Sequence, residues 1–119
     1  MFEKNMKIAY LLDFYIDLLD EHSASIIRAY YEDDLSLAEI ASGENISRQG
    51  IRHIIKKGEE QLEFFESKLG LARKHEELDG VVSSLERLKE KLLSSTDEKL
   101  VKEADALSSV ISTISNKGV

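Results

Sequence analysis

The stretch SLAEIASGENISRQGIRHIIKK, residues 36–57, decides the fold of this chain. It begins with Ser36 and, three residues later, Glu39. This is the reciprocal capping arrangement, in which each side chain satisfies an amide left open at a helix start. We therefore expect a short helix over residues 37–42. Ala41 falls on its inward side, and this small side chain allows a following helix to cross at close range.

The residues after the short helix predict a tight turn and a second helix. Asn45 tolerates the left-handed backbone conformation that glycine usually supplies, and Ile46 plugs the turn. Ser47 is a favourable N-cap for the next helix, whose Ile51 and Ile54 are expected to point inward. A small residue, a tight turn and apolar anchors at these offsets predict a helix-turn-helix.

The outward side of this second helix is basic in a chain that is otherwise acidic. Residues 47–57 contain four Lys or Arg and no Asp or Glu, whereas the whole chain of 119 residues has a formal net charge of −7. Arginine and glutamine in a first turn suit phosphates and base edges, although Gly50 costs the helix about 1 kcal/mol relative to alanine. The alternative is a basic, solvated face on a module that only packs helices. The nucleic-acid-binding residues that we predict are Ser47, Arg48, Gln49, Arg52, His53, Lys56 and Lys57.

Composition excludes several classes of protein. Hydrophobic residues make up 42% of the chain and charged residues 33%, which is typical of a packed core rather than a disordered chain. The absence of cysteine excludes disulfides, thiolate zinc sites and thiol catalysis, and the absence of proline permits long helices. No apolar run approaches the roughly 20 residues that cross a bilayer, and the first residues lack the order of a signal peptide. We expect a cytoplasmic protein without membrane insertion.

No group of residues indicates catalysis or a metal. The sequence has no nucleophile–base pair, glycine-rich phosphate loop or metal-ligand cluster, so we expect neither an enzyme nor a cofactor. Asp13, Asp17 and Asp20 share one face of the first expected helix, and such a face either binds a divalent cation or is merely solvated. We favour solvation, because no histidine or second acidic pair completes a site. None of the three histidines has a spacing suited to zinc.

Two more helices are expected before the helix-turn-helix, and its second helix is long. The first helix is expected over Asn5–Leu19 and the next from near Ser23, with an acidic turn at residues 32–34. The second helix of the motif continues to about Leu69, where Gly70 is a candidate end or kink. The apolar residues of the first two helices recur at helical spacing and are Ile8, Leu11, Leu12, Tyr15, Leu19, Ile26, Ile27, Tyr30 and Tyr31.

After Gly70 the apolar residues step by three and four positions, as in a heptad seam. Ser95 and Glu98 repeat the capping arrangement and predict the start of a second helix of this kind. Two such helices joined by a short turn indicate an antiparallel hairpin, which closes within one chain or pairs with another. The two seams consist of Leu78, Val81, Leu85, Leu88 and Leu92, and of Leu100, Ala104, Leu107, Ile111 and Ile114.

Four segments of the chain, in order and spacing, resemble a known family. They are LLDFYIDLL (11–19), YYEDDLSLAEIA (30–41), SRQGI (47–51) and IKK (55–57), and the resemblance covers about residues 6–69. Together they are similar to the YlxM-type proteins, a bacterial family to which DNA binding is ascribed. The resemblance implies a head similar to the sigma-factor region that reads promoter elements. It also implies a link to the signal recognition particle, because genes of the family usually lie beside those of its components.

The sequence therefore predicts an all-α protein in two parts. A helix-turn-helix head of three to four helices is expected over residues 1–69, and the resemblance implies that it is similar to sigma-factor region 4. A C-terminal helical hairpin is expected over residues 70–119. The predicted function is DNA binding in transcription regulation. The alternative is a protein- or RNA-interaction adaptor of the signal recognition particle system, in which the helix-turn-helix is only a scaffold.

The apolar seams also predict self-association as a homodimer. Two seams of this size are more than a thin hairpin hides unless it docks on the head or on a partner. A helix-turn-helix gains affinity when two copies occupy two half-sites, and twofold symmetry is the commonest way to assemble them. The alternative is a six-helix bundle within one chain.

Overall fold

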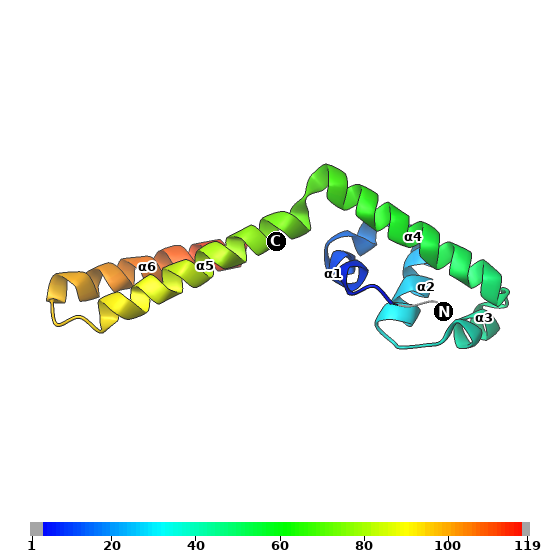
Figure 1. Cartoon of the computed structure of the whole chain (residues 1–119), viewed down its shortest axis with the longest axis horizontal. Helices are drawn as coiled ribbons and strands as arrows, with labels where there is room; N and C mark the ends of the chain where they lie inside the picture. Colours follow the sequence, from blue (N-terminus) through cyan, green and yellow to red (C-terminus); the bar gives the residue numbers. More distant parts are fainter. Residues whose placement is uncertain (1–3, 118–119) are drawn as a thin grey trace. The chain divides into compact units, whose positions relative to one another are not determined.

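The structure is a computed structural model that describes residues 4–117 (Figure 1). Within this range it contains α-helices, one short 3-10 helix and no strand, which confirms the predicted all-α fold. None of the helices described is long and apolar enough to cross a membrane. In chain order the elements are α1 (Met6–Tyr15), η1 (Ile16–Leu18), α2 (Glu21–Tyr31), α3 (Leu37–Glu44), α4 (Arg48–Leu69), α5 (Leu71–Leu93) and α6 (Glu98–Lys117).

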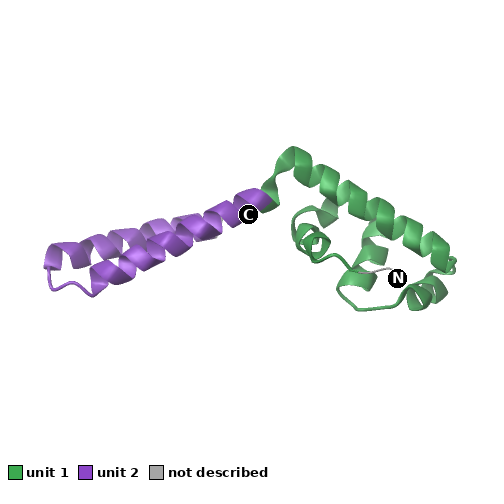
Figure 2. Ribbon diagram, in the orientation of Figure 1, with its two compact units in different colours: residues 1–72 green, residues 73–119 purple. Residues whose placement is uncertain are grey.

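The contacts within the chain divide it into two compact units (Figure 2). The first, Met1–Ala72, contains α1 to α4 and the first residues of α5, and we call it the head. The second, Arg73–Val119, contains the rest of α5 and α6, and we call it the hairpin. The head carries the helix-turn-helix.

In the head, α1, α2 and α3 all pack against α4. The inward face of α4 carries Ile51, Ile55 and Leu62, whose side chains are fully buried. Gly58 lies on the same face, and a Cβ added there would overlap Cδ1 of Ile27. The side chain of Ile27 in α2 therefore packs directly over Gly58 of α4, in space that a Cβ there would occupy.

The core face of α4 lies slightly to one side of the predicted one. Ile51 is fully buried as expected, but Ile54 is only partly buried at the edge of the core. The deeper anchor is the next residue, Ile55. Ile51, Ile55, Gly58 and Leu62 follow one another at spacings of four, three and four, which keeps them on a single helix face.

The first two helices are bounded differently from the prediction. Helix α1 ends at Tyr15 and η1 follows, so the expected end at Leu19 is wrong. Leu19 is extended because the next residue, Asp20, turns to cap α2. The Asp20 carboxylate accepts a hydrogen bond from the Ser23 amide at 2.8 Å, and α2 accordingly begins at Glu21 rather than near Ser23.

A buried tyrosine fixes the junction of α4 and α5. Gly70 ends α4 in the left-handed conformation with φ 62°, as its position predicted. The hydroxyl of Tyr15 donates to Oε1 of Glu66 at 2.5 Å and accepts from the Leu71 amide at 2.9 Å. Oε1 of Glu66 also accepts from the Ala72 amide at 3.0 Å. Side chains of α1 and α4 thus satisfy two of the amides left open at the start of α5.

A second tyrosine–glutamate pair holds α2 against α4. The hydroxyl of Tyr31 donates to Glu59 and accepts from the Asn5 amide at 3.3 Å. Burial raises the pKa of Tyr31, and the hydrogen bond to Glu59 raises it further. Because Glu59 and Glu66 lie seven residues apart, both carboxylates stand on one side of α4 and tie it to α2 and α1.

Helices α5 and α6 lie side by side and antiparallel, and they close the hairpin within one chain (Figure 1). Ala104 is fully buried, which its small side chain permits where the helices meet. The predicted capping of α6 by Ser95 and Glu98 is wrong. Asp97 is the cap instead: its carboxylate accepts from the Lys99 amide at 2.9 Å, while the Ser95 hydroxyl accepts from the Asp97 amide at 3.1 Å.

The hairpin contact differs from the predicted seams in part. Leu78, Leu85 and Leu92 lie at the contact and are partly buried, but Val81 and Leu88 are 47% and 46% exposed. The residue that follows each of these two is partly buried instead. A contact seam displaced by one residue at these positions still has the spacing of three and four residues that the sequence predicted. The partly buried residues next to them in α5 are Val82 and Lys89. In α6, Val101 is partly buried rather than Leu100, whereas Leu107, Ile111 and Ile114 are partly buried as predicted.

Candidate nucleic-acid interface

The first helix of the motif, α3, begins with the predicted capping box. The Ser36 hydroxyl accepts from the Glu39 amide at 3.1 Å, and the Glu39 carboxylate accepts from the Ser36 amide at 3.0 Å. The hydrogen bond from the Ser36 amide lowers the pKa of Glu39, because it stabilises the charged form. The helix runs past the expected end at Ser42 to Glu44, and Asn45 then adopts the predicted left-handed conformation, with φ 56° and ψ 39°.

The turn between α3 and α4 is tightly packed. The Ile46 amide donates to the Ala41 carbonyl at 3.1 Å, and the Ile46 side chain is partly buried against the core. Ser47 caps α4 as predicted, accepting from the Gly50 amide at 3.0 Å. A Cβ on Gly50 would lie 2.7 Å from Cγ2 of Ile46. Gly50 therefore leaves room for the Ile46 side chain in the turn and is not merely a cost to the helix.

All seven predicted contact residues are exposed on the first half of α4 or at its cap. Gln49, His53 and Lys56 follow at spacings of four and three residues, so they share one face. This face lies opposite the buried Ile51 and Ile55. In a helix-turn-helix, this outward face of the second helix is the one that meets a major groove.

Arg52 stands at the side of this face, towards α2. Burial raises the pKa of Tyr30 in α2, and the positive charges of Lys4 and Arg52 oppose that rise. Nζ of Lys4 lies 5.0 Å from the centroid of the Tyr30 ring, and the ammonium also pairs with Asp34. Arg52 therefore lies at the edge of the candidate interface and not at its centre.

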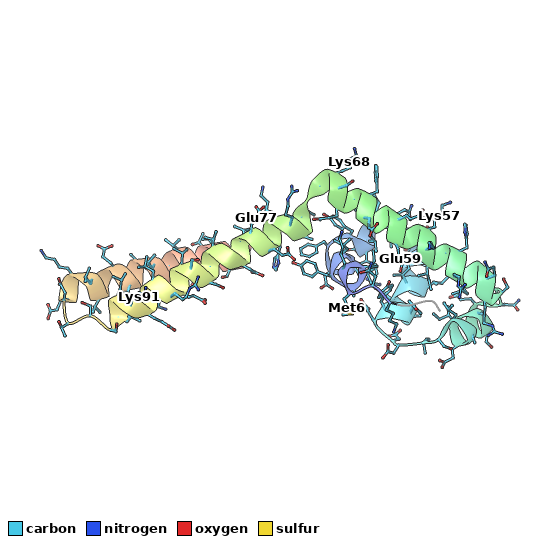
Figure 3. All side chains as sticks on the ribbon, viewed as in Figure 1. Met6, Lys57, Glu59, Lys68, Glu77 and Lys91 are labelled. Atoms are coloured by element: carbon cyan, nitrogen blue, oxygen red, sulfur yellow. The ribbon has the colours of Figure 1, made fainter. Side chains whose placement is uncertain are left out.

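The charge of α4 changes sign along the helix. Residues 47–57 contain no acidic side chain, and Lys57 and Glu59 mark the change (Figure 3). The N-terminal end of α4 also carries the positive end of the helix dipole and has no acidic residue in its first turn. The first half of the helix is therefore its basic half. The acidic side chains of the second half are Glu59, Glu60, Glu63 and Glu66.

A hollow of about 360 Å³ lies beside the basic side chains, between the start of α2 and α4. His53 and Lys57 line it together with Asp20. The Asp20 carboxylate accepts hydrogen bonds from the amide and the hydroxyl of Ser23. Both bonds lower the pKa of Asp20, and the bond from the amide has the larger effect. A negative charge therefore borders the interface, which the sequence analysis missed. The sequence does contain a signal for it: Asp20 lies three residues before Ser23, the spacing at which an aspartate caps the start of a helix.

A hydrogen bond that was also missed links α2 to the end of α3. Nε2 of His22 lies 3.0 Å from Oε2 of Glu44, and the two helices pack against each other. The helix that precedes the motif thus supports the motif itself. Among the described residues, no group of three or more His, Asp or Glu is placed to hold a metal ion.

The packed short helix, the left-handed turn and the second helix with a basic outward face define a helix-turn-helix protein. The chain belongs to the UPF0122 family, described as "Putative helix-turn-helix protein, YlxM / p13 like", whose model matches residues 2–106. The resemblance found in the sequence is thereby confirmed. The match extends past residue 69, the end of that resemblance, and includes all of α5.

Relatives from several bacteria are similar to this chain. A UPF0122 protein of Listeria innocua is 44% identical over 86 residues, which cover 72% of this chain and 78% of the relative. One from Clostridium botulinum is 43% identical over 100 residues, or 83% and 92% of the two chains. One from Bacillus thuringiensis is 43% identical over 88 residues, or 74% and 80%. An alignment of 100 residues is longer than the head, so the similarity extends into the hairpin.

Proposed function

We propose that this protein binds DNA and regulates transcription, with the first half of α4 as its recognition helix. The observation that carries the proposal is the coincidence of a helix-turn-helix with an acid-free stretch, residues 47–57, in a chain of net charge −7. A local basic cluster supplies the attraction to phosphate that the chain as a whole lacks.

The outward face of α4 reads the bases in this proposal. Gln49, His53 and Lys56 point into the major groove, where glutamine pairs with adenine and lysine with guanine. Ser47 and the open amides at the helix start contact a phosphate at the groove edge.

The flanking cations fix the orientation of the helix. Arg48, Arg52 and Lys57 contact phosphates on either side of the groove. Glu59 and Glu60 follow directly, and they would be repelled by a duplex lying along the whole helix. Helix α4 therefore enters the groove with its N-terminal end, and its acidic half points away from the DNA.

The proposal is tested with the purified full-length protein on a random-sequence duplex library, followed by titration of the selected site at several salt concentrations. Arg48→Ala with Arg52→Ala should weaken binding at least about tenfold and lower the salt slope by about two units, roughly one per phosphate contact. Gln49→Ala should mainly relax sequence preference. The matched control is Lys68→Ala with Lys102→Ala, which removes the same charge from exposed positions outside the interface. Equal losses in both double variants, or none in either, would refute the recognition helix.

We further propose that the protein acts in the cytoplasm as a homodimer, and that it binds its target without catalysing a reaction. Two heads on two half-sites bind more tightly than one, which matters for an acidic chain with a single basic helix half. We therefore expect the selected DNA sequence to contain two half-sites.

A second candidate function is an adaptor of the signal recognition particle system that contacts RNA or protein. It is favoured by the acidic side chains near the motif, Glu39 and Glu44 on α3 and Asp20 at the start of α2, because they oppose a close approach of phosphate. The basic half of α4 would then contact an RNA backbone by shape, or the motif would serve only as a scaffold.

One experiment separates the two functions. The tagged protein is crosslinked in its native cell, purified, and its bound DNA, RNA and proteins are identified. Enrichment of defined DNA sites, lost in the Arg48→Ala with Arg52→Ala variant, supports transcription regulation. Enrichment of the particle's RNA or proteins without DNA sites supports the adaptor.

A further inference from the structure

The hairpin leaves apolar side chains uncovered along its length. Of its described residues only Ala104 is fully buried. Val81, Leu88 and Val110 are 46–47% exposed, and Leu100 is 40% exposed. Within the hairpin, the packing of two helices alone cannot remove these side chains from water.

The exposed residues Val81, Leu88 and Leu100 share one side of the hairpin. In α5, Val81 and Leu88 each directly precede a partly buried contact residue, Val82 or Lys89. In α6 the residues that directly precede the partly buried contact positions 101 and 108 are again apolar. Both helices are right-handed and they run in opposite directions. The residues that directly precede contact residues therefore lie on the same side of the hairpin in both helices. Along α6 these apolar residues are Leu100, which is exposed, and Leu107, which is partly buried; the partly buried Ile114 continues their spacing of seven.

The other side of the hairpin is polar. The positions that directly follow contact residues are Asp79 and Glu86 in α5, and Asp105 and Ser112 in α6. Leu93, at the end of α5, is the exception. Each helix therefore has three apolar positions in every seven residues, two at the contact with the other helix and one on the apolar side. This pattern is typical of a helix with two neighbours in a bundle, whereas a pair of helices needs only two such positions.

From this asymmetry we infer that a second copy of the chain packs on the apolar side of the hairpin and completes a four-helix bundle. The side formed by Val81, Leu88, Leu100, Leu107 and Ile114 is called the open face. The inference deepens the proposed homodimer, and it does not depend on DNA binding.

The apolar residues of the open face are arranged so that two copies related by a twofold axis place apolar side chains against apolar side chains. Ser84 and Leu107 lie equally far from the turn between α5 and α6, so they stand at one level of the hairpin. A twofold axis at this level, perpendicular to the helices, sets Val81 opposite Leu88 of the second copy. The same axis sets Leu100 opposite Ile114 of the second copy, so that apolar side chains meet apolar ones in both helices.

The same axis also matches charges. Glu77 and Lys91 flank the open face towards opposite ends of α5 (Figure 3). With α5 of the second copy antiparallel, Glu77 of each chain lies near Lys91 of the other. A parallel pairing of the two α5 helices would place like charges together, so the charge pattern selects the antiparallel one.

Sedimentation equilibrium of the full-length protein tests the open face. Wild type should have twice the chain mass of 13.5 kDa at tens of micromolar. Val81→Lys with Leu88→Lys should raise the dimer dissociation constant at least about a hundredfold, because two charges would be buried without partners. The matched control, Ser83→Lys with Ser112→Lys, adds the same charge to exposed positions of the other side and should leave the dimer intact.

The outcomes separate the surface from the function. A monomeric wild type overturns the homodimer and the open face, while DNA binding by the head stands. A dimer that survives Val81→Lys with Leu88→Lys overturns the open face alone. Circular dichroism of each variant shows whether the helices remain folded.

A charge exchange tests the antiparallel arrangement. Glu77→Lys places a second ammonium group near Lys91 of the second copy at two symmetric positions, and it should raise the dissociation constant about threefold to tenfold. Adding Lys91→Glu should restore the wild-type value, because the pairs then form with reversed sign. If the double variant dimerises no better than Glu77→Lys, the antiparallel twofold is overturned.

Discussion

The head and the hairpin bury apolar surface to very different extents. In the head, three helices surround α4, and a contiguous core forms around fully buried residues such as Tyr15, Ile27 and Ile55. In the hairpin each helix has one neighbour, and among its described residues only Ala104 is fully buried. Both units have amphipathic helices of similar pattern. The number of neighbouring helices, and not the apolar pattern of a helix, therefore determines how much of that helix is buried.

This difference has a functional counterpart. The closed core of the head holds the turn between α3 and α4 in one geometry, which a recognition helix requires. In the proposed dimer, the open face of the hairpin is the apolar surface on which the second chain packs. Substitutions that disturb the head should therefore lower the free energy of unfolding, whereas those on the open face should act on association.

The largest expected effect is that of Gly58→Ala in the head. The added Cβ would overlap Cδ1 of Ile27, and because Ile27 is fully buried, its side chain cannot move without displacing its neighbours. We expect the free energy of unfolding to fall by about 3 kcal/mol, at the upper end for an overpacked core. Urea denaturation, monitored by tyrosine fluorescence, measures this free energy. An unchanged midpoint would show that α2 and α4 do not pack this closely.

A somewhat smaller effect is expected for Ala41→Leu in α3. Ala41 is 8% exposed, and its carbonyl accepts the Ile46 amide that closes the turn. A leucine would push α3 away from α4 and cost about 1–2 kcal/mol. Ala38→Leu is the matched control, because Ala38 is exposed on the same helix. Equal stability of the two variants would contradict the close crossing.

The sequence predicted those features whose signals are local. Ser36 with Glu39 specifies a capping box, Ser47 an N-cap, and Asn45 and Gly70 left-handed ends, and all four are confirmed. Each of these signals lies within a few residues of the amide or carbonyl that it satisfies, so no tertiary information is needed to find it.

Features set by distant residues were not predictable in this way. Gly58 is explained only by Ile27, and the contact of Tyr15 with Glu66 joins helices far apart in the chain. The hairpin seam was partly misplaced, because α5 is apolar at three positions in seven and the sequence does not say which two of them meet α6. For the candidate interface, helical spacing predicted which side chains are exposed. It did not predict that Arg52 stands at the side next to Tyr30.

The tyrosines allow the head to be destabilised selectively by alkaline pH. All four tyrosines of the sequence lie in the head, and burial raises the pKa of Tyr15, Tyr30 and Tyr31 above the usual value of 10.0. A group whose pKa is raised on folding contributes stability that is present below the unfolded pKa and is lost as pH rises through the folded pKa. Above pH 10 the head should therefore lose stability as these hydroxyls ionise.

Tyr15→Phe isolates one of these hydroxyls. The variant loses the hydrogen bonds to Glu66 and Leu71 and should be about 1 kcal/mol less stable at neutral pH. Its stability should fall less steeply than that of wild type above pH 10, since one titrating group is gone. Urea midpoints from pH 7 to 11 measure both effects. Identical pH dependence in the two proteins would show that Tyr15 ionises equally in the folded and unfolded states.

The smallest effect, of opposite sign, is expected for Gly80→Ala in the hairpin. A Cβ on Gly80 meets nothing within 4 Å, so the substitution adds no clash. Alanine is favoured over glycine inside a helix because the unfolded chain loses less conformational freedom, and we expect a gain of up to about 1 kcal/mol. Gly58→Ala and Gly80→Ala make the same chemical change, so the difference between their effects isolates the packing of the head. The proposed twofold leaves the Gly80 side of α5 open, and thermal melts followed by circular dichroism should show the gain. A loss of stability at Gly80 would mean that another surface covers this side of the helix, and the open face would then be misplaced.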